Sequence, residues 1–300
     1  MTGKIWAELA NELAETAAVV GKSVVAVHGR RHPSSGIVWS SDSIVTASHA
    51  LRRDEDITVV LAPAKNVSGR VAGRDARTDL AVVRLQQSVD APAPVWGDSS
   101  NRRVGELVLA LGRTWRGNVV ASSGVLSGVM GAWRTWRGGE LEQFIRPDLV
   151  MYPGFSGGPL VNAQGEVLGL NTAGLHQSGI TVPAATVARV VTELLERGSI
   201  ARPYLGLAMQ AVALPESLRA KLNLKNSAGL LIVHVEPGSP ADKAGVLLGD
   251  ILLEIEGQPA DDTDAVQAVL RKATVGKFVE AGFIRAGAVI KVKIELGARG

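Results

Sequence analysis

Residues 152–165 read YPGFSGGPLVNAQG and place one serine on a glycine-rich loop between two short β-type runs. The pattern G-x-S-x-G is typical of α/β-hydrolases, in which a helix begins directly after the serine. Here Gly157, Gly158 and Pro159 follow Ser156, and a short apolar run and a polar turn come next, so no helix is expected to begin at this point. The sequence therefore predicts a serine on a loop between strands.

Short apolar runs, with glycine at most of their joints, surround this loop. The chain has 34 Gly and 13 Pro residues and only 4% aromatic residues, a composition that favours tight turns between short strands. The spacing of the runs is typical of a barrel or a sandwich, and their number suffices for two small barrels. The expected strands are residues 24–29, 36–40, 43–47, 57–62, 80–85, 107–112, 123–129, 159–162 and 167–173.

Helical periodicity marks the two ends of this β region. Residues 1–22 are predicted to form an amphipathic helix, and residues 183–197 a helix that closes a first domain spanning 23–198. A short linker, residues 199–203, leads to residues 204–300, where strands and helices alternate as in a small α+β domain. The predicted fold is therefore mainly β, with a larger β domain before a smaller α+β domain.

Composition narrows the possible partners and chemistry. Lys and Arg number 32 against 29 Asp and Glu, and the charges are scattered along the chain. Paired arginines at 30–31, 52–53 and 102–103 would suit a nucleic-acid surface, but solvated faces are the favoured interpretation, and no nucleic-acid partner is expected. Without cysteine there is no disulfide framework and no thiolate nucleophile. Nothing in the sequence indicates a metal, a nucleotide or an organic cofactor.

The N-terminal segment bears on localisation. Glu8, Glu12 and Glu15 interrupt its apolar positions, so it is not expected to be a signal peptide. No segment approaches the roughly 18 uninterrupted apolar residues of a membrane span. A chain that is complete as given is therefore expected to be cytoplasmic.

A serine hydroxyl becomes a useful nucleophile only when a base takes its proton and a third group orients that base. His49 has the best context among the histidines, because it follows a β run at a point where a turn begins. Asp79 directly precedes the apolar run LAVVRL, so its carboxylate is expected at the edge of the core, where it needs a partner. Asp75 is the competing carboxylate and lies farther from that run.

The motifs TASHA, TDLAVV and GFSGGPLV occur in the order His, Asp, Ser. With them the chain resembles the trypsin-like serine proteases of the HtrA (Deg) family over roughly residues 20–297. The resemblance implies a trypsin-like double β-barrel followed by a PDZ domain, with His49 as general base, Asp79 as orienting acid and Ser156 as nucleophile. It also implies cleavage of unfolded or damaged proteins, and a location in the cell envelope or periplasm if a leader was removed.

Two other functional classes are alternatives to a serine protease. A catalytically silent PDZ scaffold or chaperone would keep the domains and lack the chemistry. An esterase would require a helix after Ser156, which the sequence does not predict.

The resemblance assigns further residues around the serine. The backbone N–H groups of Gly154 and Ser156 are expected to form the oxyanion hole. Phe155 stands where the family commonly has Asn, and it is expected to anchor the loop by packing. The primary pocket is assigned to five residues without charge, which predicts cleavage after an apolar residue. These residues are Val150, Met151, Thr172, Gly174 and Leu175.

In the second domain, Tyr204, Leu205, Gly206 and Leu207 resemble the carboxylate-binding loop of PDZ domains. The loop is expected to bind a terminal carboxylate, and the peptide is expected to add as a strand beside residues 207–212, with its side chains facing a helix near residues 265–270. The alternative is a docking module that binds no peptide.

Two further segments have counterparts in the family. The segment AWRTWRGGE, residues 132–140, corresponds to a loop that senses PDZ occupancy, and Arg134 or Arg137 is expected to contact the PDZ side and help to order the Ser156 loop. Its tryptophans have the alternative role of packing the loop down. Ile5 and Trp6 suggest a homotrimer, and the alternative is a helix that folds back on its own barrel.

Overall fold

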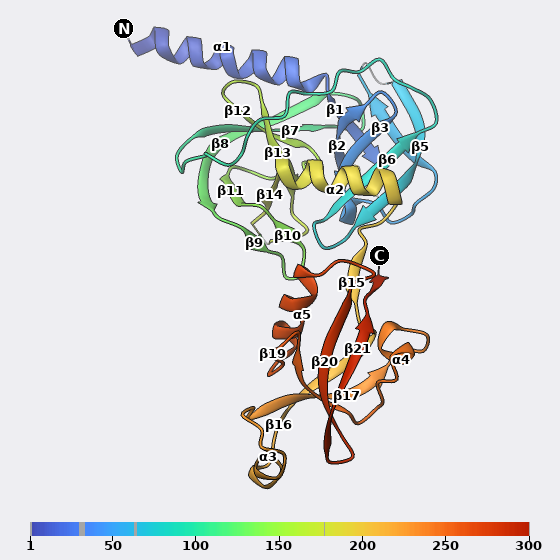
Figure 1. Ribbon diagram of the computed structural model, residues 1–300. Helices are drawn as coiled ribbons and strands as arrows, with labels where there is room; N and C mark the ends of the chain where they lie inside the picture. Colours follow the sequence, from blue (N-terminus) through green and yellow to red (C-terminus); the bar gives the residue numbers. More distant parts are fainter. Residues whose placement is uncertain (1, 30–33, 63–64, 177, 300) are drawn as a thin grey trace. The chain divides into compact units, whose positions relative to one another are not determined.

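The structure is a computed structural model that describes residues 2–29, 34–62, 65–176 and 178–299 (Figure 1). The arginine pair at 30–31 lies outside the described residues. The chain folds as two compact units, residues 1–200 and 201–300. The fold is mainly β, as the sequence predicts, with two closed six-stranded barrels in the first unit and a smaller α+β sheet in the second.

The first barrel consists of antiparallel strands in the order β1-β2-β3-β6-β5-β4. Its strands are β1 (Val24–His28), β2 (Ser34–Ser40), β3 (Ser43–Ala47), β4 (Ile57–Leu61), β5 (Lys65–Asp75) and β6 (Leu80–Leu85). Every predicted run in this region forms a strand. The sequence did not predict β5, because buried and exposed residues alternate along it and leave no continuous apolar run.

The second barrel has the order β11-β14-β13-β12-β7-β8. Its strands are β7 (Leu107–Arg113), β8 (Val119–Met130), β11 (Phe144–Asp148), β12 (Pro159–Asn162), β13 (Val167–Thr172) and β14 (Ile180–Pro183). A small hairpin, β9 (Trp133–Arg134) and β10 (Glu140–Leu141), projects between β8 and β11. The loop that carries Ser156 connects β11 to β12.

Two helices complete the first unit. α2 (Ala184–Arg197) ends at Gly198, which has a φ of 73°, and its apolar face is buried in the core. α1 (Thr2–Gly21) packs on the barrel only near its C-terminal end, where Val20 is buried, whereas Ile5 and Trp6 are 65% and 69% exposed (Figure 1). In the described part of the chain, no helix has both the length and the apolar character that membrane crossing requires.

The second unit is an antiparallel sheet in the order β16-β17-β18-β20-β21, so β16 lies at an edge. The strands are β16 (Leu207–Ala213), β17 (Ala228–Val235), β18 (Ile251–Ile255), β20 (Phe278–Arg285) and β21 (Ala288–Glu295), with α3 (Glu216–Leu222), α4 (Pro240–Lys243) and α5 (Thr263–Lys272). β15 (Arg202–Tyr204) pairs with β22 (Gly297–Arg299), and β19 (Gln258–Pro259) pairs with β18. Residues 205–206 separate β15 from β16.

Candidate active site

His49 and Asp79 form a direct pair on the first barrel. His49 lies in the short 3₁₀ helix η1 (Ser48–Ala50) after β3, and Asp79 ends the turn before β6. The His49 amide donates to Asp79 Oδ1 at 2.8 Å, and the His49 ring nitrogen Nδ1 lies 2.6 Å from Asp79 Oδ2. Because an ionised carboxylate only accepts hydrogen bonds, Nδ1 carries the proton and Nε2 has a free lone pair.

Asp79 has a backbone φ of 59°, in the left-handed region that a residue with a side chain rarely adopts. That conformation costs about 1–2 kcal/mol. The Ser48 amide donates to the Asp79 carbonyl at 2.9 Å, and the Thr172 hydroxyl donates to the same Oδ2 that faces His49. These contacts offset the cost and fix the carboxylate, whose residue is 1% exposed.

Asp75, the competing candidate for the orienting carboxylate, stabilises the turn before β6. Its carboxylate accepts the Arg77 amide at 3.2 Å, the Thr78 amide at 3.3 Å and the Thr78 hydroxyl at 2.7 Å. It therefore closes the turn that presents Asp79. Asp79, the preferred candidate, is the carboxylate that contacts the imidazole.

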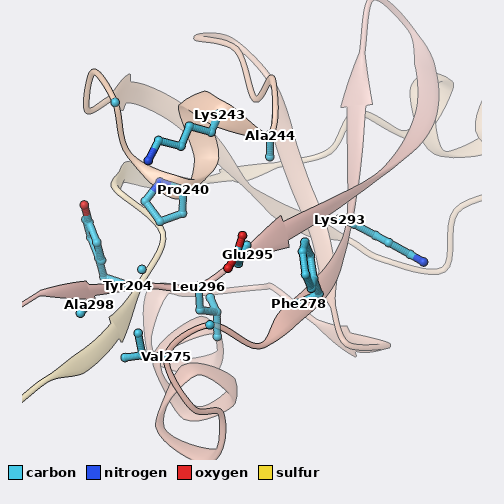
Figure 2. Close-up of a pocket in the computed structure, with 13 residues that line it drawn as sticks. Tyr204, Pro240, Lys243, Ala244, Val275, Phe278, Lys293, Glu295, Leu296 and Ala298 are labelled. Carbon is cyan, nitrogen blue, oxygen red and sulfur yellow. The ribbon is translucent and has the colours of Figure 1, made fainter.

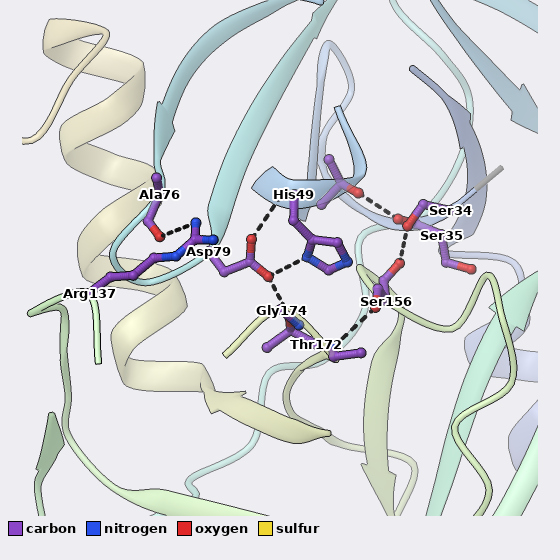
Figure 3. Close-up of polar contacts among 11 residues, drawn as sticks. Ser34, Ser35, His49, Ala76, Asp79, Arg137, Ser156, Thr172 and Gly174 are labelled. Atoms are coloured by element: carbon purple, nitrogen blue, oxygen red, sulfur yellow. Dashed lines mark hydrogen bonds and ion pairs between the residues drawn. The ribbon is translucent and has the colours of Figure 1, made fainter. Parts of the chain in front are cut away.

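The Ser156 loop is held through its main-chain carbonyls by strand β2. The Ser35 hydroxyl donates to the Gly154 carbonyl at 2.7 Å, and the Ser35 amide donates to the Ser156 carbonyl at 3.0 Å. The Ser34 hydroxyl donates to the same Ser156 carbonyl (Figure 3). No local sequence pattern indicates these contacts, because the partners are 119 to 122 positions apart.

Buried polar groups support Ser35 in turn. Thr46 Oγ1 donates to the Ser35 carbonyl at 2.6 Å, and the Arg113 amide donates to Ser35 Oγ at 3.0 Å. The Arg113 guanidinium donates to the carbonyls of three residues at the start of the barrels, and burial lowers the pKa of this guanidinium from its ordinary value. The three acceptors are Gly21, Val24 and Gly117.

Some backbone amides of the Ser156 loop donate hydrogen bonds within the protein, and others do not. The Phe155 amide donates to the Tyr152 carbonyl at 3.1 Å, and the Gly157 amide donates to the Asn171 carbonyl at 2.8 Å. Across the described part of the chain, neither the Gly154 nor the Ser156 amide donates to a protein group. Gly154 has a φ of 101°, which glycine adopts without strain. The two amides assigned to the oxyanion hole are thus free of protein partners within the described residues.

Phe155 anchors the loop by packing, as the sequence predicts. Its side chain is 2% exposed, and its ring centroid lies 5.9 Å from that of Tyr152. It packs in a cluster of the second barrel that includes Leu126, Ile145 and Leu160.

The segment that follows β13 brings the three candidate catalytic residues together. Thr172 bonds Asp79, the Ala173 amide donates to Ser156 Oγ at 3.2 Å, and a Cβ placed on Gly174 would lie 2.6 Å from His49 Nδ1. Figure 3 shows the His49 ring between Asp79 and Ser156, with the edge that bears Nε2 turned toward the Ser156 segment. Among the contacts of the described residues, no hydrogen bond joins Nε2 to Ser156 Oγ.

The five residues assigned to the primary pocket differ in their exposure and in their contacts. Val150 is 54% exposed, and the Met151 side chain lies close to Gly179. Thr172 is fully buried with its hydroxyl on Asp79, and Gly174 lies against the His–Asp pair. Leu175 is 3% exposed within the core cluster that it shares with α2. The apolar primary pocket therefore stays a prediction.

The hairpin at 132–140 contacts the turn that presents Asp79. Thr135 Oγ1 donates to the Arg77 carbonyl at 2.7 Å, and Arg137 Nη1 donates to the Ala76 carbonyl at 3.5 Å (Figure 3). Arg137 also lies over the Trp136 ring, 4.5 Å from its centroid. The expected contact of Arg134 or Arg137 with the PDZ side stays a prediction.

In the second unit, the loop between β15 and β16 is also held by its carbonyls. The Leu205 carbonyl accepts the Ala241 amide at 2.9 Å, and the Gly206 carbonyl accepts the Glu236 amide at 2.9 Å. Within the described residues, the amides of Leu205 and Gly206 donate to no protein group. Leu207 begins the edge strand β16, where it pairs with Val235.

Tyr204 pairs with Gly297 and lines a pocket of about 570 Å³ in the second unit (Figure 2). Pro240, Phe278 and Lys293 also line this pocket. Tyr204 thus flanks the predicted carboxylate loop and belongs to a strand.

The two closed barrels, followed by the small α+β sheet, define a trypsin-like peptidase domain and a PDZ domain. Residues 34–170 match the family described as trypsin-like peptidase domain, and residues 203–296 match the PDZ domain family. The Do-like serine protease HtrA of Lactobacillus helveticus is 31% identical over an aligned length of 281 residues, and the alignment covers 87% of this chain and 68% of that protein. The chain belongs to the HtrA family of serine endopeptidases.

Other relatives agree with this assignment. A probable periplasmic DegP-like serine endoprotease of Halomonas elongata is 30% identical over an aligned length of 275 residues, and the alignment covers 89% of this chain and 57% of that protein. The serine endoprotease from Yersinia pestis has a TM-score of 0.70 at 25% identity, covering 96% of this chain and 98% of that one. The HtrA-type protease AlgW, solved with a tripeptide, has a TM-score of 0.66 at 27% identity, covering 96% and 97%.

Proposed function

We propose that the chain hydrolyses peptide bonds of unfolded or damaged proteins, with Ser156 as nucleophile, His49 as general base and Asp79 as its orienting acid. The observation that carries the proposal is the segment 172–174, whose consecutive residues contact Asp79, Ser156 and the His49 ring in turn. Three side chains far apart in sequence thereby meet at one place, as nucleophilic catalysis by serine requires.

In the proposed reaction, the Ser156 hydroxyl gives its proton to His49 Nε2 while its oxygen attacks the carbonyl carbon of the scissile bond. A side-chain rotation of Ser156 would bring the hydroxyl within reach of Nε2, a contact that commonly tightens only when substrate binds. Asp79 accepts a hydrogen bond from Nδ1–H throughout and stabilises the imidazolium without becoming protonated.

The tetrahedral intermediate places a negative charge on the former carbonyl oxygen. The unused amides of Gly154 and Ser156 are the proposed donors to that oxygen, and the hydrogen bonds from β2 to the carbonyls of the same two residues hold the loop around them. The imidazolium then protonates the leaving amine, and a water molecule, deprotonated by His49, releases the acyl group from Ser156.

The primary specificity is proposed to favour an apolar residue before the cleaved bond. None of the five assigned residues bears a charge that would neutralise a substrate Lys or Arg. Cleavage of a peptide library tests this: apolar residues should dominate at the cleaved position, and a strong preference for Arg would refute the assignment.

The second unit is proposed to bind peptide C-termini. The free amides of Leu205 and Gly206 suit a terminal carboxylate, and the edge strand β16 leaves room for one more antiparallel strand beside α5. The AlgW structure contains a tripeptide, which supports a peptide ligand for this module.

Casein cleavage by the wild type and by Ser156→Ala, each with and without a hydrophobic C-terminal peptide, tests catalysis and regulation together. Activity is expected only with Ser156 present, and the peptide is expected to change its rate. A fluorophosphonate probe distinguishes the rival function: a folded wild type that is never labelled would be a silent scaffold or chaperone.

Self-association is a further proposal, since Ile5 and Trp6 are exposed on α1. A homotrimer should sediment at three times the monomer mass, and Trp6→Glu should return it to the monomer. A monomeric wild type at all concentrations would contradict this.

A further inference from the structure

Arg113 is a buried cation that no step of the proposed reaction uses. It is the last residue of β7 and is 4% exposed. We propose that Arg113 is a positioning residue: its guanidinium fixes the end of β7, and its amide thereby holds Ser35, whose hydroxyl bonds the Gly154 carbonyl in the Ser156 loop. The proposal rests on the proteolytic function proposed above, because that loop carries the proposed donors to the oxyanion.

The Arg113 guanidinium joins three elements of the first unit. Nε donates to the carbonyl of Val24, the first residue of β1, and Nη2 donates to that of Gly21, the last residue of α1. Nη1 donates to the Gly117 carbonyl in the turn between β7 and β8. Within the described residues, every acceptor of this guanidinium is a backbone carbonyl. Because an arginine stays charged when it is buried, these bonds replace its lost hydration and fix the side chain at three points.

The contact with α1 completes the C-terminal end of that helix. The last carbonyls of an α-helix have no partner within the helix, and this end bears a partial negative charge. The two amides that follow α1 bond the carbonyls of Val19 and Val20, and the Gly21 carbonyl accepts the Arg113 guanidinium. The last turn of α1 contains no basic residue. A cation from β7 therefore caps α1, and the helix end in turn holds the guanidinium.

The end of β7 reaches the Ser156 loop directly. β12 pairs with residues 108–110 of β7, and beyond this pairing the Arg113 amide donates to Ser35 Oγ at 3.0 Å. A Cβ placed on Gly112 would lie 3.1 Å from the same oxygen and 3.6 Å from Phe155 Cγ. The last two residues of β7 therefore contact both β2 and the loop that carries the nucleophile.

Ser35 transmits the position of β7 to the loop. Its hydroxyl oxygen accepts the Arg113 amide through a lone pair and gives its one proton to the Gly154 carbonyl at 2.7 Å. A shift of the end of β7 would weaken this pair of bonds and loosen the loop around the Gly154 and Ser156 amides. Misplacement of reacting groups by about 1 Å can reduce a rate on the order of 10²-fold, so a small shift is sufficient to slow the reaction.

The test begins with Arg113→Met in the full chain, which removes the guanidinium and keeps the backbone amide. We expect kcat on a short peptide to fall about tenfold, with KM within about twofold of the wild type, because the oxyanion is present only in the reaction. A peptide boronic acid, whose boron adds to Ser156 Oγ and places an oxygen in the oxyanion position, should bind about tenfold more weakly. Arg113→Lys keeps the charge with a single donor group, and its kcat should fall about threefold.

A second substitution tests whether Arg113 acts through Ser35. In a chain that already carries Ser35→Ala, Arg113→Met should lower kcat by about twofold or less, although it should still lower the melting temperature. Two changes that act through one contact are not additive, whereas independent changes multiply their effects on a rate. Fully multiplied losses in the double variant would overturn the proposed role.

Two controls separate positioning from general stability. Arg84→Met removes an arginine of β6 that pairs with Asp42, and Val67→Ala truncates a buried side chain of β5. Both variants should keep kcat near that of the wild type, even where the melting temperature falls as far as in Arg113→Met. An equal loss of kcat in Val67→Ala at an equal loss of melting temperature would overturn the positioning role.

An unchanged kcat in folded Arg113→Met, or a rise in KM alone, would likewise overturn the role of Arg113 and leave the protease intact. If Arg113→Met does not fold, Arg113→Lys decides, and an unchanged kcat in that variant has the same meaning. A wild type that neither turns over the peptide nor reacts with fluorophosphonate would overturn the proposed function, and the role of Arg113 with it.

Discussion

The loop that carries Ser156 and the loop at residues 204–207 are held in the same way, one in each unit of the chain. In both, neighbouring groups donate to the loop carbonyls, and amides of the loop are left without protein partners. Both contain a glycine at positive φ, Gly154 at 101° and Gly206 at 82°. Fixed carbonyls hold each loop in one conformation, and in that conformation backbone N–H groups are open to an anion.

The difference lies in what surrounds the amides. The first loop carries a hydroxyl beside a histidine whose tautomer is set by a buried carboxylate. The second loop has Leu205, Gly206 and Leu207, which offer neither a nucleophile nor a base. On the proposed functions, one backbone device therefore stabilises a transient oxyanion and the other retains a permanent carboxylate. Anion binding alone does not make a catalytic site.

The largest effect is expected from Ser156→Ala, which removes chemistry from the first loop and leaves its amides in place. Peptide cleavage should fall on the order of 10⁶-fold, since the nucleophile itself is lost. The affinity of the second unit for a peptide C-terminus, measured by fluorescence anisotropy, should not change. Residual cleavage at a rate near that of the wild type would show that another residue is the nucleophile.

Asp79→Asn should lower kcat by roughly 10⁴-fold, because an amide cannot hold His49 in the tautomer that leaves Nε2 free. Steady-state kinetics on a short peptide measure the loss. Asp42→Asn is the control, since Asp42 pairs with Arg84 on the same barrel, away from His49. Equal losses in the two variants would indicate damage to the barrel and would contradict the orienting role.

Gly206→Ala tests the second loop alone. A Cβ at this position would collide with the Ser239 side chain, and the φ of 82° is unfavourable for alanine. The affinity for a peptide with a free C-terminus should fall by roughly tenfold or more, with little change in cleavage of a short peptide. Gly245→Ala is matched, because its φ is 78° and its surroundings are open. If both variants bind normally, this loop does not hold the carboxylate.

The smallest effect is expected from Ser35→Ala, which weakens the hydrogen bonds by which β2 holds the Ser156 loop. Ser35 donates to the Gly154 carbonyl and accepts from the Arg113 amide, and such buried bonds contribute about 1–2 kcal/mol. We expect kcat to fall about tenfold, with little change in KM, because the oxyanion is present only in the reaction. Ser127→Ala removes an exposed bond to the Arg146 carbonyl and serves as control. A rise in KM with kcat unchanged would contradict this role of Ser35.

The sequence predicted most of the fold from local patterns. Continuous apolar runs predicted nine of the twelve barrel strands that the structure describes, and the periodicity of residues 183–197 together with Gly198 predicted α2 and its end. β5, β11 and β14 were not predicted. β5 alternates in burial, β11 mixes its apolar residues with an arginine, a proline and an aspartate, and β14 is only four residues long and ends in proline. These strands form because neighbouring strands supply hydrogen bonds, which no local pattern encodes.

The candidate site was likewise predicted only in the part that local motifs indicate. Motif order pointed to His49, Asp79 and Ser156, but the site residues assigned by alignment alone fared differently: Thr172 serves Asp79, and Leu175 is part of the core. Ser34 and Ser35 were missed entirely. A hydroxyl that bonds a carbonyl more than a hundred positions away leaves no trace in sequence spacing.

By itself, therefore, the sequence determined the classes of element and the chemical groups available, because backbone preference and side-chain type are local properties. The tertiary structure decided which groups meet. In the folded chain the two barrels pack against each other so that β2 holds the Ser156 loop by hydrogen bonds. Long-range hydrogen bonds maintain Asp79 in its strained backbone conformation.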